Sequence, residues 1–185
     1  MTFSLCSKGD AVTDLQHETR AARRTLVCWN YAGEVIVDPG LSLCIVWMDA
    51  DVVELSVHAS NGRFSGEVRL YAGHDVLDLL AGALRSFPTS NQDHREIELG
   101  AFEPRCAGGG LRLRLRCIDG AGHAVLDVTL RSDADQAGGR SETADFSMPI
   151  EAAALDQFVT RLETGRVAVG SAAALISVAT SRALG

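Results

Sequence analysis

The stretch LRLRLRCIDGAGHAVLDVTL, residues 111–130, alternates apolar and polar side chains on both sides of a glycine-containing segment. Such alternation is the pattern of β-strands with one buried face, and the glycines between the two runs predict a hairpin. With a two-residue loop at 120–121, each apolar residue faces another apolar residue, and Arg114 faces Asp127. The polar face of this hairpin carries a row of three arginines: Arg112, Arg114 and Arg116.

A second hairpin is predicted over residues 53–71, where the same alternation surrounds Asn61-Gly62. Asparagine followed by glycine favours a tight hairpin turn because both residues tolerate positive φ. Taking these two residues as the loop places Glu54 opposite Arg69 and keeps the apolar residues on one face. Turn type and face pattern therefore agree on a hairpin here.

Strands are also predicted over 41–48, 95–101 and 142–150, and amphipathic helices over 76–87 and 151–164. Short turns between consecutive strands favour antiparallel pairing. The sequence therefore predicts an α+β fold with one antiparallel sheet of six to seven strands, open or curled into a half-barrel. Both helices are expected on one face of that sheet. Trp47 lies in a strand that is apolar on both sides and is expected in the core.

Three regions are expected along the chain. Residues 1–40 form an N-terminal appendage that is at most partly ordered, and residues 41–165 form a single α+β domain. Residues 166–185 are rich in alanine and serine and lack large side chains, so we expect a frayed or loosely docked tail. The triplet Gly108–Gly110 is interpreted as a flexible loop.

Composition narrows the class of protein. The chain has 185 residues and a net charge of −7 at pH 7. An acidic protein is a poor match for nucleic acid or for an anionic membrane, which both require a basic face. The five cysteines are widely spaced and odd in number, which is typical of reduced thiols rather than of a disulfide framework. No signal-peptide pattern occurs at the N-terminus, so a cytoplasmic location is expected.

No pattern in the sequence indicates a metal or a cofactor, and no catalytic residue can be named. The arginine row with Asp127 is one candidate binding site, because guanidinium groups bind carboxylates and phosphates bidentately. The alternative is a solvated strand face on which acidic neighbours balance the arginines. Trp29 and Tyr31 are a second candidate, since aromatic residues dominate protein interfaces; the alternative is that they cover an edge of the core.

Several turn and packing residues resemble those of a group of small bacterial α+β proteins. They include the run from Trp47 through Asn61-Gly62-Arg63-Phe64-Ser65-Gly66, Phe87-Pro88, the Gly108–Gly110 triplet and Asp119-Gly120-Ala121-Gly122-His123. Some groups similar to it are identified as immunity proteins of polymorphic toxin systems. The likeness covers about residues 42–164. It implies binding of a toxin and assigns no catalytic residue.

Together these observations favour a non-enzymatic cytoplasmic binding protein, with an immunity protein that occludes a basic toxin as its specific form. Residues 41–165 contain 11 basic and 19 acidic side chains, so a basic protein partner is expected. Two alternatives stay open. One is an anion-binding protein or small enzyme that uses Arg112, Arg114, Arg116 and Asp127. The other is a structural subunit of a larger assembly anchored by Trp29 and Tyr31.

Overall fold

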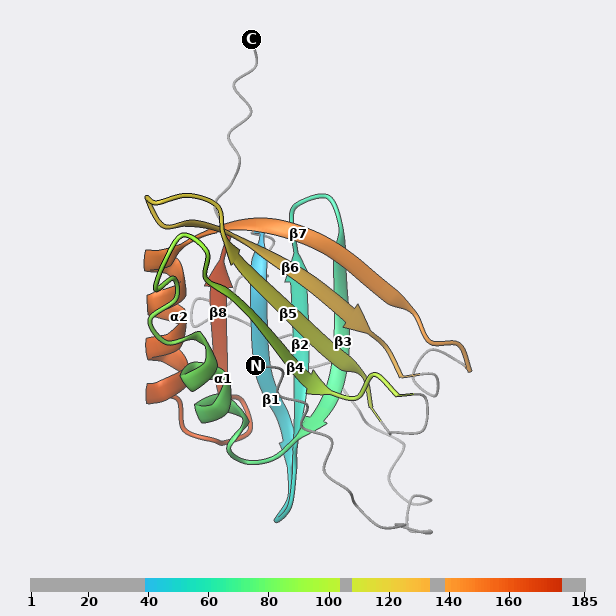
Figure 1. Cartoon of the computed structure of the whole chain (residues 1–185). Coiled ribbons are helices and arrows are strands. Elements are labelled where there is room, and N and C mark those ends of the chain that lie inside the picture. The colour runs from blue at the N-terminus through green and yellow to red at the C-terminus, as the bar shows by residue number, and fades with distance from the viewer. Residues whose placement is uncertain (1–38, 104–107, 134–138, 178–185) are drawn as a thin grey trace.

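The computed structural model describes residues 39–103, 108–133 and 139–177. These residues form an α+β fold of two four-stranded antiparallel sheets and two helices (Figure 1). The elements in chain order are β1 (Gly40–Met48), β2 (Val53–Ser60), β3 (Ser65–Ala72), α1 (Val76–Leu84), β4 (His94–Gly100), β5 (Gly110–Cys117), β6 (His123–Arg131), β7 (Thr143–Glu151), α2 (Ala152–Thr164) and β8 (Ala172–Ile176).

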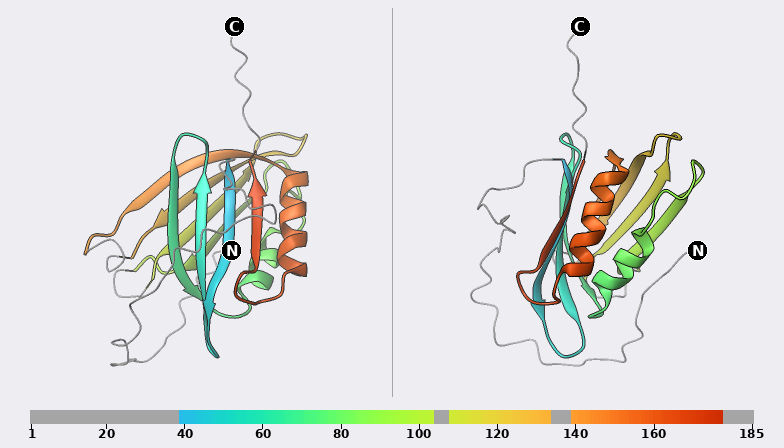
Figure 2. Two further views of the ribbon diagram at one scale, coloured as in Figure 1. Left: turned by 180° about the vertical axis from the view of Figure 1, so that it is seen from behind. Right: turned by 90° about the vertical axis from the view of Figure 1, so that its left-hand side faces the viewer.

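The expected single sheet is thus wrong in one respect, because the strands divide into two sheets. The first sheet has the order β3-β2-β1-β8 and the second the order β4-β5-β6-β7. Their inner faces pack on each other, and the helices lie between them along one side (Figure 2). Both helices therefore contact apolar side chains of two sheets rather than cover one face of a single sheet. The apolar stripe of α2 was predicted correctly and is buried. α1 ends at Leu84 rather than at residue 87, and it buries Leu77 and Ala81 in addition to the expected Val76, Leu80 and Leu84.

The sheets separate at the connection from β3 to β4, which contains α1. β3 contacts three strands of the second sheet, β4, β5 and β6, without joining it as a neighbour. Glycines permit this close crossing. The amide of Gly109 donates to the carbonyl of Arg69 on β3 (2.8 Å), and a Cβ on Gly66 would lie 3.0 Å from Leu130 Cδ1. Gly108–Gly110, expected as a flexible loop, in fact joins the two sheets.

The hairpin of β5 and β6 has the predicted register, with Leu115 opposite Leu126 and Arg114 opposite Asp127. The apolar residues face the core, and the arginines face outward. The face pattern had indicated this register correctly, because a one-residue slip would have turned the apolar set to solvent. The expected two-residue loop at 120–121 is wrong, since the amide of Ile118 donates to the carbonyl of His123 (2.8 Å) and leaves residues 119–122 as the loop.

The hairpin of β2 and β3 forms as predicted, but its register differs by two residues. Ser60 pairs with Ser65, so the loop has four residues, 61–64, rather than two. The Asn61 carboxamide oxygen accepts the amides of Arg63 (3.0 Å) and Phe64 (2.9 Å), and these bonds hold the wider loop closed. A shift of two keeps every side chain on its predicted face, so the pattern of burial survived the error. Glu54 consequently lies opposite Tyr71 rather than Arg69.

The expected tail, 166–185, is corrected for the part that the structure describes. Residues 172–176 form β8, which pairs with β1 at the edge of the first sheet. Small residues suit this position, because α2 packs closely against β8 and buries Ala173 and Leu175. Residues 1–38 lie outside the described residues, so the expected appendage is not addressed by the structure.

Trp47 was expected in the core and is instead 44% exposed. A β-bulge between Ile45 and Trp47 shifts the pairing of β1 with β2, so that Trp47 lies opposite Glu54. The extra residue changes the side of the sheet to which the following residues point. Alternation alone did not reveal this bulge, because β1 is apolar at both alternate positions.

Arg95 closes the C-terminal end of α1. Its guanidinium donates to the carbonyls of Ala83 and Arg85 (both 2.8 Å) and to the carboxylate of Asp93 (3.1 Å), and it lies over the ring of Phe87. Carbonyls in the last turn of a helix have no partner inside the helix. Arg95 supplies that partner from β4 and so ties α1 to the second sheet.

Candidate functional site: a charged sheet face and an acidic end

The outward side chains of β4, β5 and β6 form a charged face, made up of Glu96, Glu98, Arg112, Arg114, Arg116 and Asp127. Each arginine uses its Nε. Arg112 binds Glu98, Arg114 binds Glu96 (3.0 Å), and Arg116 binds Asp127 (3.3 Å). The remaining oxygen of Asp127 accepts the hydroxyl of Ser147 (2.5 Å). Acid and base therefore alternate across the strands.

The predicted pairing of Arg114 with Asp127 holds for the backbone register but not for the ion pair. Arg114 turns toward Glu96 on β4, and Asp127 is bound diagonally by Arg116. Diagonal neighbours across strands lie within reach of a side chain as long as arginine. The structure thus brings Arg112, Arg114, Arg116 and Asp127 onto one face and gives each arginine a carboxylate partner. This arrangement is what a solvated, self-neutralised strand face needs.

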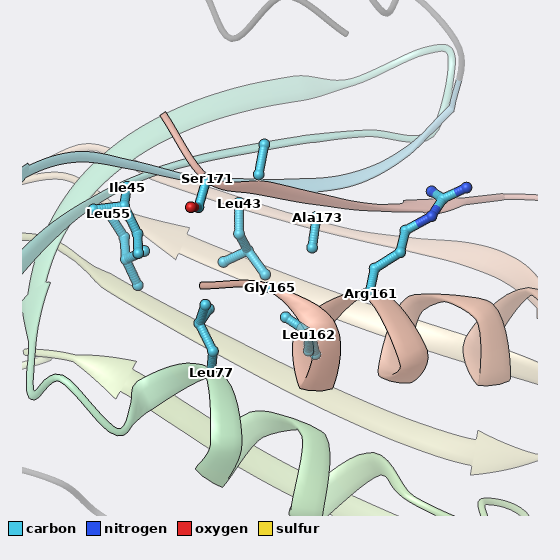
Figure 3. A pocket seen from close by; sticks show the side chains of 10 residues that line it. Leu43, Ile45, Leu55, Leu77, Arg161, Leu162, Gly165, Ser171 and Ala173 are labelled. Carbon is cyan, nitrogen blue, oxygen red and sulfur yellow. The ribbon is translucent and has the colours of Figure 1, made fainter. Parts of the chain in front are cut away.

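A pocket with a cavity volume of about 10 Å³ lies between the first sheet and the helices (Figure 3). Leu43, Ile45 and Leu55 line it from the sheet, and Leu77 and Leu162 line it from α1 and α2. That volume is room for about one water molecule, far below the roughly 300–1,000 Å³ of typical small-molecule sites. Its lining is almost wholly aliphatic and offers no set of converging polar groups, so we interpret it as a packing seam.

The turn between β5 and β6 is organised by Asp119. Its carboxylate accepts the amides of Ala121 (2.9 Å) and His123 (3.3 Å) and contacts His123 Nδ1 at 2.7 Å. The hydrogen bond with Asp119 and the negative charge of that residue raise the pKa of His123 above its usual 6.5. The same hydrogen bond, with those from the turn amides, lowers the pKa of Asp119.

We expect the Asp119→Asn variant to lower the pKa of His123 toward 6.5, because a neutral amide no longer favours the imidazolium. The measurement is a titration of the His123 ring by NMR. The raised pKa means that the His123 contribution to stability is complete below pH 6.5 and is lost as the pH rises through the higher folded-state value. An unchanged His123 titration in the variant would contradict this assignment.

A second surface lies where β1 and β3 end, and we call it the acidic end: Trp47, Asp49, Asp51, Asp75 and Asp78. The four aspartates are exposed, and none of them forms an ion pair with another described residue. The amides of Val52 and Asp51 donate to Asp49 (both 2.9 Å) and hold its pKa below 3.8. Asp49 therefore keeps its negative charge at neutral and mildly acidic pH.

The sequence did not single out the acidic end. The sequence pattern indicated turn positions for Asp49 and Asp51 and a helix-entry position for Asp75. It indicated a core position for Trp47. The loops containing Asp49 and His74 lie close together because β1 and β3 flank β2 and run in the same direction (Figure 1). Both strands therefore finish at the same end of the sheet. The other aromatic candidates, Trp29 and Tyr31, lie outside the described residues.

Among the described residues, no group of three or more His, Cys, Asp and Glu side chains is placed to hold a metal ion. The described helices include none that is long and apolar enough to cross a membrane. No protein-family model matches the chain, and neither a curated protein nor a solved structure matches it significantly.

Proposed function

We propose that this protein is a non-enzymatic binding protein that recognises a basic protein through its acidic end. The observation that carries the proposal is the exposure of Trp47 near the end of β1, followed in the next loop by the exposed Asp49 and Asp51. Neither aspartate has an ion-pair partner among the described residues, and the loop that contains His74 and Asp75 lies close enough for His74 to interact with Asp49. Tryptophan is among the residues most enriched at the energetic centres of interfaces. Uncompensated negative charge accelerates and orients association with a basic partner.

The charged face supports this assignment by contrast. Its three carboxylates are bound by three arginines of the same sheet, so the face as a whole carries little net charge. At the acidic end, the basic groups of the adjoining segments are His74 and Arg69, and Arg69 is bound to Glu54 (3.6 Å), against four aspartates. The net charge of −7 of the whole chain adds to the attraction.

The specific form of the proposal is an immunity protein that occludes a basic toxin in the cytoplasm. Occlusion requires only a tight, charge-complementary contact and no turnover. A nuclease toxin, with a basic surface that binds phosphates, has the required charge. The two alternative functions, anion binding by the arginine row and a structural role in an assembly, have no observation in their favour of comparable strength.

The test is affinity capture with the purified full-length chain in the lysate of its source cells, compared across variants. We expect one basic protein to be retained by the wild type and to leave at high salt. Trp47→Ala should weaken its retention at least tenfold, since buried interface aromatics contribute more than about 1–2 kcal/mol. The double variant Asp49→Asn/Asp51→Asn should slow association and reduce the salt dependence.

The matched control is Glu142→Gln/Asp156→Asn, which removes the same charge from exposed positions outside the acidic end. Like Asp49 and Asp51, neither residue forms an ion pair with another described residue. It should retain the partner nearly as well as the wild type. Equal loss in both double variants would show that net charge alone is responsible, and unchanged capture by Trp47→Ala would overturn the proposal. For the immunity form, the captured protein should kill cells on expression, and co-expression of the wild-type chain should protect them.

A further inference from the structure

Three of the four sheet edges are closed by specific contacts. On β7, Asn61 Nδ2 donates to the carbonyl of Ser147 (3.1 Å), and Ser177 Oγ donates to that of Pro149 (2.7 Å). On β8, Arg161 donates to the carbonyl of Ala174 (3.0 Å), and α2 packs alongside. On β3, the amide of Gly109 bonds to Arg69 (2.8 Å). Closing an edge in this way prevents further strands from pairing with it.

The fourth edge, β4, is different. Hydrogen-bonded residues alternate along an antiparallel pair, and bonds join Cys117 to Asp93 and Ala101 to Gly109 at its two ends. The residues of β4 that bond to β5 are therefore Arg95, Ile97 and Leu99. The backbone N–H and C=O groups of His94, Glu96 and Glu98 point away from the sheet. In the part of the chain that the structure describes, no strand pairs with this side of β4.

The side chains of this edge carry a charge pattern as well. On the outer face, two rows of side chains cross β4, β5 and β6, and each begins at β4 with a carboxylate. One row is Glu96, Arg114 and Asp127. The other row is Glu98, Arg112 and Thr129. Charge thus runs negative then positive from the edge inward. A strand added outside β4 would continue this alternation if it carried basic residues opposite Glu96 and Glu98.

We propose that the β4 edge binds an extended segment of a partner protein as an additional strand, with basic side chains at two alternate positions. Main-chain hydrogen bonds to His94, Glu96 and Glu98 supply the affinity. Arg112 and Arg114 bind the two glutamates through Oε1 only, so the second carboxylate oxygen of each glutamate selects a basic residue on the added strand. The residue between the basic pair lies beside Ile97, on the face toward the core, and is best apolar. This second surface shares with the acidic end only the class of partner and does not depend on it.

Charge also argues against a second copy of this chain as the occupant. When two β4 strands overlap fully in antiparallel register, each Glu96 faces the Glu98 of the other copy. Like charges directly opposite each other destabilise strand pairing. The same two glutamates that attract a basic segment therefore discourage self-pairing, which is a recognised way to protect an exposed edge.

The experiment uses the full-length chain, labelled for NMR, and a synthetic peptide of eight residues that alternates lysine and valine. The control peptide has glutamate in place of lysine. We expect the lysine peptide to shift the amides of His94, Glu96 and Glu98 and to slow hydrogen exchange at Glu96 and Glu98 at least tenfold. The glutamate peptide should leave these amides unchanged.

Glu96→Pro removes an outward N–H without breaking a bond to β5, and Glu96→Thr removes the same charge while keeping that N–H. Proline should abolish the exchange protection, and threonine should weaken peptide binding about three- to tenfold while keeping the protection at Glu98. A peptide that binds Glu96→Pro and Glu96→Thr equally well, that shifts only the acidic end, or that leaves the β4 amides unchanged would overturn the inference. None of these outcomes alters the result expected for Trp47→Ala, so the two proposals fail separately.

Discussion

Gly109→Ala is expected to destabilise the protein by about 3 kcal/mol, measured as the change in the free energy of unfolding by urea titration. A Cβ at this position would lie 2.1 Å from Val68 Cγ2 and 2.5 Å from the carbonyl oxygen of Arg131. The two contacts come from different sheets, so β3 and β6 would have to move apart to admit one methyl group. The hydrogen bond from Gly109 to Arg69 would be strained by the same movement.

Gly120→Ala provides the matched control for this substitution. A Cβ there meets nothing within 4 Å, and the residue does not have a positive φ. We expect a change within about 0.5 kcal/mol, or a gain of up to about 1 kcal/mol from the reduced freedom of the unfolded chain. Similar stability of the two alanine variants would show that the sheets do not approach as closely as the structure indicates.

Arg95→Ala is expected to destabilise the protein by about 3 kcal/mol. The guanidinium is largely buried, with 20% of the side chain exposed, and its removal leaves Asp93, 12% exposed, without its ion-pair partner. Removing one member of a buried pair costs about 3–5 kcal/mol, and part of this is offset here because water can reach the site. The carbonyls of Ala83 and Arg85 lose their donor as well.

Arg85→Ala is the control, because Arg85 forms an exposed ion pair with Glu163 on α2. Exposed pairs contribute about 0–1 kcal/mol, so this variant should remain near wild-type stability. Its backbone carbonyl, which Arg95 binds, is unchanged by the substitution. Equal losses in both variants would show that Arg95 acts only as a surface charge.

The pH dependence of stability gives a second measure of the Arg95 contacts. Burial alone would raise the pKa of Asp93, but hydrogen bonds from Arg95 and Thr89 outweigh it and lower the pKa below 3.8. Asp93 therefore contributes stability above pH 3.8, and this contribution is lost as the pH falls through the lower folded-state value. In Arg95→Ala that acid-range loss should shrink, which chemical unfolding at several pH values between about 2.5 and 6 would detect.

The strands and helices could be predicted because each has a period that the sequence displays directly. Leu111, Leu113 and Leu115 alternate with arginines and form β5, and Leu155, Phe158 and Leu162 follow the helical period and form the buried side of α2. The β5–β6 register followed from the same alternation and from the position of its turn. The β2–β3 register did not, because Asn61 can hold a loop of two or of four residues and both loops keep the same face inward.

The arginine row shows which part of the candidate site could be predicted from the sequence and which part could not. Alternation placed Arg112, Arg114 and Arg116 on one face, and the structure confirms that placement. Which carboxylate each arginine binds depends on side-chain reach across three strands, and Arg116 takes Asp127 rather than Arg114. The acidic end escaped prediction because it is assembled from a bulge in β1 and from loops that are distant in sequence.

The sequence by itself determined the α+β class, the order of seven strands and two helices, and the buried face of each of them except β1. These are local properties, set by the spacing of apolar side chains along the backbone. Only the tertiary structure decided that the strands form two sheets, that residues 172–176 become β8 and that Trp47 lies at the surface. The physical reason is that an edge strand can end a sheet or continue it with the same hydrophobic pattern. The choice depends on the close approach at Gly109 and on the room between the sheets for α1 and α2.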